Sequence, residues 1–230
     1  MQDSTRKELI DYLKGFTTEA RLDKFEEVLS KRTKHISVVL EDLHKPHNAN
    51  AVLRSCEALG IQDIHIIENE NEFDTEGQVS IGAHQWLTLN RYNEDSGMNV
   101  ETCFESLRKE GYKIIATTPH ENDSNINELD ISEKTALVFG GELTGISDKV
   151  KEQADGFVKI PMYGFSESFN ISVSAAISLY DVTSRLRATG LNWGLSEKEK
   201  EVLTLDWLIQ TIKAGEKLVE KFMNEQEAGD

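Results

Sequence analysis

The chain has 230 residues, of which 38% are hydrophobic and 29% charged, and a formal net charge of −16. These values fit an α/β domain with a sizeable core and short appended helices, and they exclude a disordered chain. No apolar run approaches the roughly 18–20 residues of a membrane span. The N-terminus lacks the cleavage pattern of a secretory signal, and two cysteines, Cys56 and Cys103, cannot form a disulfide framework. We therefore expect a reduced, cytoplasmic protein without membrane contact.

The charge is distributed unevenly along the chain. Residues 1–35 hold eight Lys/Arg against seven Asp/Glu, residues 36–190 hold 12 against 25, and residues 191–230 hold five against nine. An acidic body repels phosphate, so RNA would have to bind at local basic sites. Acidic composition alone favours a small-molecule enzyme. The contrast divides the chain into an N-terminal extension over 1–35, an acidic body over 36–190 and a C-terminal extension over 191–230.

The hydrophobic pattern changes period several times along the chain. Helical spacing over 4–16 and 19–31 predicts two short N-terminal helices. Short apolar runs then alternate with helical segments, which indicates a mostly parallel sheet with helices on both faces. A run with five acids from Glu68 to Glu76 predicts a solvated loop. The predicted strands are 35–40, 64–67, 112–117, 135–139 and 157–160, and the predicted helices are 48–59, 100–109, 147–154 and 170–187.

The C-terminal tail carries its own helix signals. Ser196 and Glu199 form the sequence pattern of a capping box. One apolar stripe follows, and it requires a partner surface on the body or on a second subunit. Its residues are Leu205, Leu208, Ile209, Ile212, Val219 and Phe222.

The first candidate functional segment runs from His44 to Cys56, HKPHNANAVLRSC. It places a polar loop at the carboxyl end of a predicted strand, where open α/β sheets bind ligands. Asn48 is placed to cap the following helix and Arg54 lies inside that helix; both also suit a plain cap and a surface charge. His44 and His47 have no further ligands nearby in the sequence, so we predict no metal site.

The second candidate segment is LVFGGELTG, residues 137–145. Gly140 and Gly141 follow a predicted strand, and paired glycines let backbone amides approach a nucleoside closely. The spacing fits neither a dinucleotide fingerprint nor a P-loop. A plain strand–turn–helix junction remains possible from the glycines alone, but Glu142 would put a carboxylate at the mouth of the sheet.

The third candidate segment is IPMYGFSESFNISVSAA, residues 160–176. Small polar residues crowd the start of the predicted helix over 170–187. A cap needs one hydroxyl or amide, whereas this loop supplies Ser166, Ser168, Asn170 and Ser172 within seven residues. The surplus indicates a binding or catalytic role.

In order and spacing, these three segments resemble the motifs of the SpoU/TrmH branch of the SPOUT RNA methyltransferases, over roughly residues 36–187. The resemblance implies 2′-O-methylation of an RNA ribose with S-adenosylmethionine. It also implies a deep trefoil knot in the C-terminal part of the domain and a homodimer with its active site near the subunit interface. Because the appendages are short, family analogy favours tRNA as the partner, at the D-loop guanosine in position 18.

Other functions remain open at this point. Within the family, a ribosomal RNA ribose or the ribose of a tRNA wobble position is a possible target. A non-catalytic RNA-binding module of the same fold would have no reason to keep the full set of polar motif residues. A nucleotide-dependent oxidoreductase is disfavoured by the missing glycine fingerprint.

The resemblance carries roles onto individual residues. The polar motif positions, which it implies are catalytic, are Asn48, Arg54, Glu142, Ser168 and Asn170. The positions that match the cofactor pocket are Thr118, Pro119, Gly140, Gly141, Ile160, Met162 and Phe169, where leucine is usual in place of Phe169. As RNA contacts we predict two sets of basic residues. In the N-terminal extension, whose positive charge is diluted by acids, they are Arg21, Lys24, Lys31, Arg32 and Lys34, and at the end of the predicted helix over 170–187 they are Arg185 and Arg187. RNA binding that depends on them should weaken steeply with salt.

Overall fold

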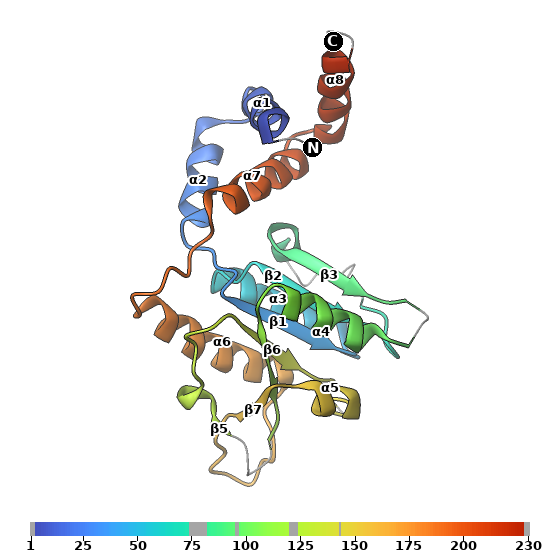
Figure 1. Ribbon diagram of the computed structural model, residues 1–230, viewed down its shortest axis with the longest axis vertical. Helices are drawn as coiled ribbons and strands as arrows, with labels where there is room; N and C mark the ends of the chain where they lie inside the picture. The colour runs from blue at the N-terminus through green and yellow to red at the C-terminus, as the bar shows by residue number, and fades with distance from the viewer. Residues whose placement is uncertain (1–2, 74–81, 95–96, 120–123, 143, 228–230) are drawn as a thin grey trace. The chain divides into compact units, whose positions relative to one another are not determined.

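The computed structural model describes residues 3–73, 82–94, 97–119, 124–142 and 144–227. The chain divides into two compact units, an α/β unit of Thr33–Trp193 and a helical unit of Met1–Arg32 with Gly194–Asp230 (Figure 1). The sequence predicted divisions after residues 35 and 190 and two separate extensions. In the structure the divisions fall three residues away, and the two end segments form one unit.

A seven-stranded sheet lies at the centre of the α/β unit. Its strand order is β3-β2-β1-β6-β4-β7-β5, and every neighbouring pair is parallel, as the alternating pattern predicted. The strands β3 and β5 were not predicted, because three of the five residues of β3 are polar and β5 has only two residues, both polar. The bounds are β1 (Ile36–Glu41), β2 (Asp63–Ile67), β3 (Thr88–Tyr92), β4 (Lys113–Thr117), β5 (Ser124–Asn125), β6 (Thr135–Phe139) and β7 (Gly156–Lys159).

Helices cover both faces of this sheet, as predicted (Figure 1). Val38 and Leu40 of β1 pack in one core with α3 (Pro46–Ala58) and α6 (Ile171–Arg187), while Val39 packs in the other with α4 (Asn99–Lys109) and α5 (Asp148–Gln153). Alternate side chains of a strand point to opposite faces. Because both faces are covered, all six residues of β1 are buried, which explains why four of them are apolar and do not alternate with polar ones. Two short 3-10 helices complete the unit, η1 (Ala83–Trp86) and η2 (Ile126–Glu128).

The helical unit contains α1 (Asp3–Lys14), α2 (Glu19–Leu29), α7 (Glu197–Thr211) and α8 (Gly215–Glu227). The predicted capping box of Ser196 and Glu199 is present at the start of α7. The predicted apolar stripe is divided between α7 and α8, because the chain turns at Ala214, whose φ is 60°. The stripe finds a partner within the unit, since Leu205 and Leu208 are buried and the Phe222 ring packs against Tyr12 of α1.

One local prediction is wrong, and that of a solvated loop from Glu68 to Glu76 fails only at Glu68 among the described acids, since Glu70 and Glu72 are exposed. The helix α3 begins at Pro46 with Lys45 as its N-cap, so Asn48 lies inside the first turn and is buried at 3% exposure instead of capping the helix. Proline suits the first helical turn, where its missing N–H is not needed. Glu68, in the predicted solvated loop, is also buried, because its carboxylate pairs with Arg91 at 2.6 Å and accepts the Phe73 amide. Asp74 and Glu76 of that run lie outside the described residues.

Candidate functional site

A cavity of about 590 Å³ opens at the carboxyl ends of β4, β6 and β7. The loops that follow these three strands form its walls, together with the start of α6. Parallel strands bring their carboxyl ends to one edge of a sheet, which is why segments far apart in the sequence meet here. All seven residues proposed for the cofactor line this cavity: Thr118, Pro119, Gly140, Gly141, Ile160, Met162 and Phe169.

The loop after β6 is folded too tightly for any residue but glycine at position 140. A Cβ atom on Gly140 would lie 2.2 Å from the carbonyl carbon and oxygen of Gly145 and 2.4 Å from the Ile146 nitrogen. A Cβ on Gly141 would lie 3.0 Å from the Asp42 carbonyl oxygen. Gly145 itself has a φ of 66°, the left-handed region that glycine adopts without cost. The wall of the cavity at this point is therefore bare backbone.

A chain of hydrogen bonds joins the three sequence motifs. The Asn48 amide nitrogen donates to Glu142 Oε1 at 2.6 Å, and the Asn170 amide nitrogen donates to Asn48 Oδ1 at 3.3 Å. Asn170 is also the N-cap of α6, since its Oδ1 accepts the Ser172 amide at 2.9 Å and the Ser172 hydroxyl at 2.6 Å. The side-chain orientations of Asn48 and Asn170 are thus fixed by one another and by Glu142.

Glu142 is the ionised end of this chain. Burial alone would raise the pKa of its carboxyl group, but hydrogen bonds from the Asn48 side chain and from backbone amides hold the pKa below its ordinary value. One of these donors is the His44 amide, 3.2 Å from Oε2. A carboxylate that accepts several N–H donors stays charged and stays in place. Glu142 therefore serves as a fixed acceptor that orders the loop between β1 and α3.

Several residues around the cavity were not singled out from the sequence. Lys45, Lys151, Lys159 and Glu167 line it, as does Thr144. Just behind it, the buried Glu41 at the end of β1 accepts the Ser147 amide at 2.9 Å, and burial raises the pKa of its carboxyl group. A carboxylate ending an otherwise apolar strand was the available signal for Glu41. The lysines carried no sequence signal, because isolated surface lysines are common.

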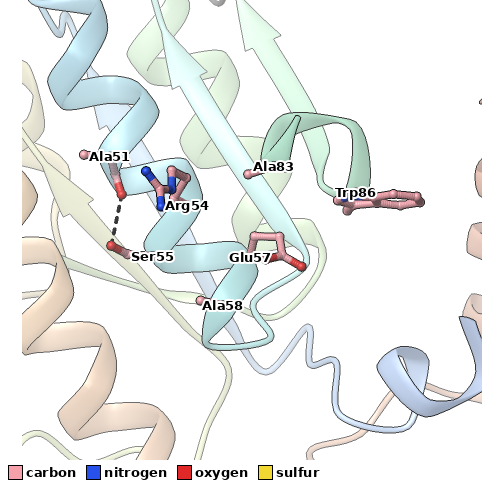
Figure 2. Close-up of a pocket in the computed structure, with 7 residues that line it drawn as sticks. All are labelled: Ala51, Arg54, Ser55, Glu57, Ala58, Ala83 and Trp86. Atoms are coloured by element: carbon pink, nitrogen blue, oxygen red, sulfur yellow. Dashed lines mark hydrogen bonds between the residues drawn. The ribbon is translucent and has the colours of Figure 1, made fainter. Parts of the chain in front are cut away.

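Of the five residues proposed as catalytic, four line the cavity and one does not. Asn48, Glu142, Ser168 and Asn170 lie around it. Arg54 is exposed on α3 and lines a separate groove of about 560 Å³ beside η1. Figure 2 shows Arg54 on the outer side of α3, near Ala51 and Ser55. Within one chain, the structure does not bring Arg54 to the other four.

The basic residues proposed as RNA contacts fall into three groups. Arg32 is 1% exposed and lies over the Trp207 ring, so its burial removes it from the surface that RNA can reach. Arg185 and Arg187 hold the chain together: Arg185 donates to Asp181 and to the carbonyls of Leu129 and Ile126, and Arg187 donates to the Leu59 carbonyl. Arg21, Lys24 and Lys31 are exposed on α2 or just after it, and Arg187 is exposed as well, while the partly buried Lys34 pairs with Asp63 at 3.0 Å.

Two further observations concern only the described part of the chain. No group of three His, Cys, Asp or Glu side chains there is arranged to hold a metal ion. No helix in the same residues is long and apolar enough to cross a membrane.

Comparisons with known proteins agree on one family. The model of the SpoU rRNA Methylase family matches residues 35–180. A tRNA (guanosine(18)-2′-O)-methyltransferase of Borreliella burgdorferi is 39% identical over 213 residues, which cover 93% of this chain and 95% of that protein. Among solved structures, the A. aeolicus TrmH/SpoU tRNA modifying enzyme is similar with a TM-score of 0.74 and 29% identity, covering 85% of this chain and 98% of that one. The SpoU methyltransferase AviRb of Streptomyces viridochromogenes, in complex with AdoMet, is similar with a TM-score of 0.60 and 25% identity, over 72% and 62% of the two chains.

Proposed function

This chain belongs to the SpoU rRNA Methylase family, and from that premise we propose that it methylates the ribose 2′-oxygen of guanosine 18 in tRNA, with S-adenosylmethionine as the methyl donor. The observation that carries the proposal is the single cavity at which all three motifs meet, tied together through Glu142, Asn48 and Asn170. The tRNA substrate is supported by the relative of 39% identity, whose name specifies guanosine 18. A cytoplasmic location belongs to the same proposal.

The residues around the cavity fit S-adenosylmethionine. A volume of about 590 Å³ lies within the roughly 300–1,000 Å³ usual for pockets that hold ligands of this size. The bare backbone at Gly140 and Gly141 allows an adenosine to approach the main chain, and Ile160, Met162 and Phe169 supply apolar surface. Phe169 is 40% exposed, so its ring is accessible at the rim. When bound, the cofactor supplies an electrophilic methyl group on a sulfonium.

The protein's own part in the reaction is to position the ribose and raise the nucleophilicity of its 2′-oxygen. Arg54 is a poor base, since a guanidinium remains protonated at neutral pH. We assign it to an RNA phosphate, which a guanidinium binds through two parallel hydrogen bonds. That contact places the 2′-hydroxyl. Its proton passes to a phosphate oxygen, either directly or through the guanidinium, which gives one of its own N–H protons to the phosphate as it takes up the ribose proton. Asn48, Ser168 and Asn170 orient the ribose, and Glu142 keeps the two asparagines in place.

A homodimer accounts for the separation of Arg54 from the cavity. The outer face of α6, and Phe169 two residues before that helix, present exposed apolar side chains: Phe169, Val173, Ile177 and Tyr180 are 40%, 42%, 38% and 65% exposed. Their spacing of four, four and three residues places them along one side of the helix. Exposed apolar stripes of this kind mark interfaces. We propose that a second copy covers this stripe and supplies its Arg54 to the cavity.

The deep trefoil knot of the superfamily is part of the same proposal. The loops after β4, β6 and β7, which line the cavity, are the segments that such a knot would thread past one another. The parallel order β6-β4-β7 in the sheet supports this topology.

A labelling experiment tests the proposal. The purified protein is incubated with S-adenosylmethionine carrying a radiolabelled methyl group and with bulk tRNA or ribosomal RNA, and the labelled ribose is mapped. We expect label on the 2′-oxygen of guanosine 18, and none on a tRNA with a 2′-deoxyribose there. Label in ribosomal RNA alone supports the ribosomal alternative. Cofactor binding without label in any RNA supports a non-catalytic module.

A further inference from the structure

Asp42, directly after β1, has a backbone conformation that side chains rarely adopt. Its φ is 47°, in the left-handed region that residues with a Cβ seldom occupy, although Asp and Asn tolerate it better than most. Such a conformation persists only where the surroundings determine it. The Asp42 amide donates to the Ile67 carbonyl at 3.0 Å, and its own carbonyl accepts the Asn71 side chain at 3.3 Å. The backbone of Asp42 is thus held from the neighbouring loop after β2.

The Asp42 carboxylate holds the same loop more extensively. Its Oδ1 accepts three successive backbone amides, from Asn69 at 2.7 Å, Glu70 at 2.9 Å and Asn71 at 3.3 Å. A charged acceptor makes stronger hydrogen bonds than a neutral one. The three amides point at one oxygen, so the backbone bends around the Asp42 carboxylate at residues 69–71, directly after Glu68. We call this arrangement the clamp.

A continuous path of hydrogen bonds leads from this clamp to the cavity. Asn71 Oδ1 lies 3.1 Å from His44 Nδ1. The backbone amide of His44 then donates to Glu142, which accepts from Asn48. The Asp42 carbonyl oxygen also lies against Gly141, at 3.0 Å from the place of a Cβ on that glycine. Asp42 is therefore linked to the first motif through Asn71, and its carbonyl oxygen lies close to Gly141 of the second motif.

We propose that Asp42 is a positioning residue for methyl transfer, which clamps the turn at residues 69–71 and thereby holds His44 and Asn48 in the orientation that faces Glu142 and Asn170. This inference rests on the proposed function. Release of the clamp removes the side-chain partner of His44 and frees the loop that carries Asn48. At Gly140 the wall of the cofactor cavity packs against Gly145 and Ile146 of its own loop after β6, and no hydrogen bond of the clamp reaches these residues. The clamp therefore acts on turnover, with little effect on cofactor affinity.

Two substitutions separate the carboxylate from the backbone conformation. Asp42→Gly keeps the left-handed φ without strain and deletes the acceptor, whereas Asp42→Asn keeps an acceptor oxygen and also tolerates that φ. For Asp42→Gly we expect kcat to fall about 10-fold, with the Kd for S-adenosylmethionine and the KM for tRNA within about twofold of the original. Asp42→Asn should remain within about threefold in kcat. Asn71→Ala should lower kcat when Asp42 is present. In the Asp42→Gly variant it should lower kcat little further, because the two substitutions break the same path of hydrogen bonds.

A second readout does not require turnover. Amide hydrogen exchange at His44, followed by NMR, should become about 10-fold faster in Asp42→Gly and stay near the original rate in Asp42→Asn. Unchanged kcat in Asp42→Gly, equal losses in both variants, or unchanged exchange at His44 overturns the inference. If the unaltered protein methylates no RNA, the proposed function fails, and the exchange rate alone decides whether Asp42 holds this loop.

Discussion

The α/β unit and the helical unit use their polar side chains in different ways. In the α/β unit, Asn48, Glu142 and Asn170 come from three distant segments and bond to one another, which fixes a geometry. In the helical unit the charged side chains pair mostly with neighbours on one helix, as Lys24 and Lys31 do with Glu27. Exposed pairs of this kind contribute little free energy. The order of the motifs in the sequence thus locates a site, whereas the number of lysines and arginines in a segment does not locate a surface that binds RNA.

The largest effect should come from Gly140→Ala in the cavity wall. The new Cβ would lie 2.2 Å from backbone atoms of Gly145, so the whole loop must shift. We expect S-adenosylmethionine binding, measured by calorimetry, to fall below detection. Gly164→Ala is the matched control, because a Cβ there meets nothing within 4 Å. Equal cofactor affinity in both variants would contradict the assignment of this wall to the cofactor.

The next largest effect comes from Arg54, compared with an arginine of the helical unit. Arg54→Ala should lower kcat/KM for tRNA methylation about 100-fold, because a misplaced ribose loses the in-line geometry. Arg54→Lys keeps the charge but loses the two parallel hydrogen bonds, so it should also lose at least about 10-fold. The matched control is Arg21→Ala, an exposed arginine of α2, for which we expect a loss of about threefold or less. Near-original turnover in Arg54→Lys would remove Arg54 from the chemistry.

A pH experiment should also distinguish the two units. Burial, with a smaller contribution from Lys34, lowers the pKa of His65 from 6.5 to about 4. At a pH between these two pKa values, His65 is protonated in the unfolded chain and neutral in the folded chain. The free energy of unfolding therefore falls as the pH falls. We expect a loss of about 2 kcal/mol between pH 7 and pH 5, measured by urea denaturation. The six histidines all lie between residues 35 and 120, outside the helical unit.

The control for this experiment is a matched histidine substitution. His65→Asn removes the buried imidazole and should flatten the pH dependence, although it also loses the hydrogen bond to the Tyr92 hydroxyl. His47→Gln changes an exposed imidazole and should leave the slope as it was. An unchanged slope in His65→Asn would assign the acid sensitivity to other groups.

The sequence predicted the layers of the fold because each buried strand and amphipathic helix carries its own local pattern. It did not predict β3, because three of its five residues are polar. It also missed the start of α3, because the helix begins at Pro46, which needs no N–H partner in the first turn, and not after a capping side chain. At the site, motif order led to the residues that line the cavity. Long-range contacts could not be predicted: the burial of Arg32, the binding of backbone carbonyls by Arg185 and the clamp at Asp42 each depend on a partner from another segment.

The smallest predicted effect concerns the exposed lysines of α2. Lys24 and Lys31 both bond to Glu27, at 2.8 and 2.7 Å, and these hydrogen bonds lower the pKa of the Glu27 carboxyl group to about 2. A phosphate must compete with that carboxylate for either lysine. Replacing both lysines with glutamine should therefore weaken tRNA binding by only about threefold and reduce the salt dependence slightly.

Glu27→Gln should change tRNA affinity in the opposite direction. It removes the negative charge to which both lysines bond, so tRNA affinity should rise about twofold at low salt, and the slope of affinity against salt should steepen. Both variants are measured by filter binding across a salt series. A loss of 10-fold or more in the double lysine variant would show that tRNA displaces Glu27, and the helical unit would then be an RNA surface despite its internal pairing. A rise in Glu27→Gln with a small loss in the lysine variant supports the α/β unit as the main determinant of binding.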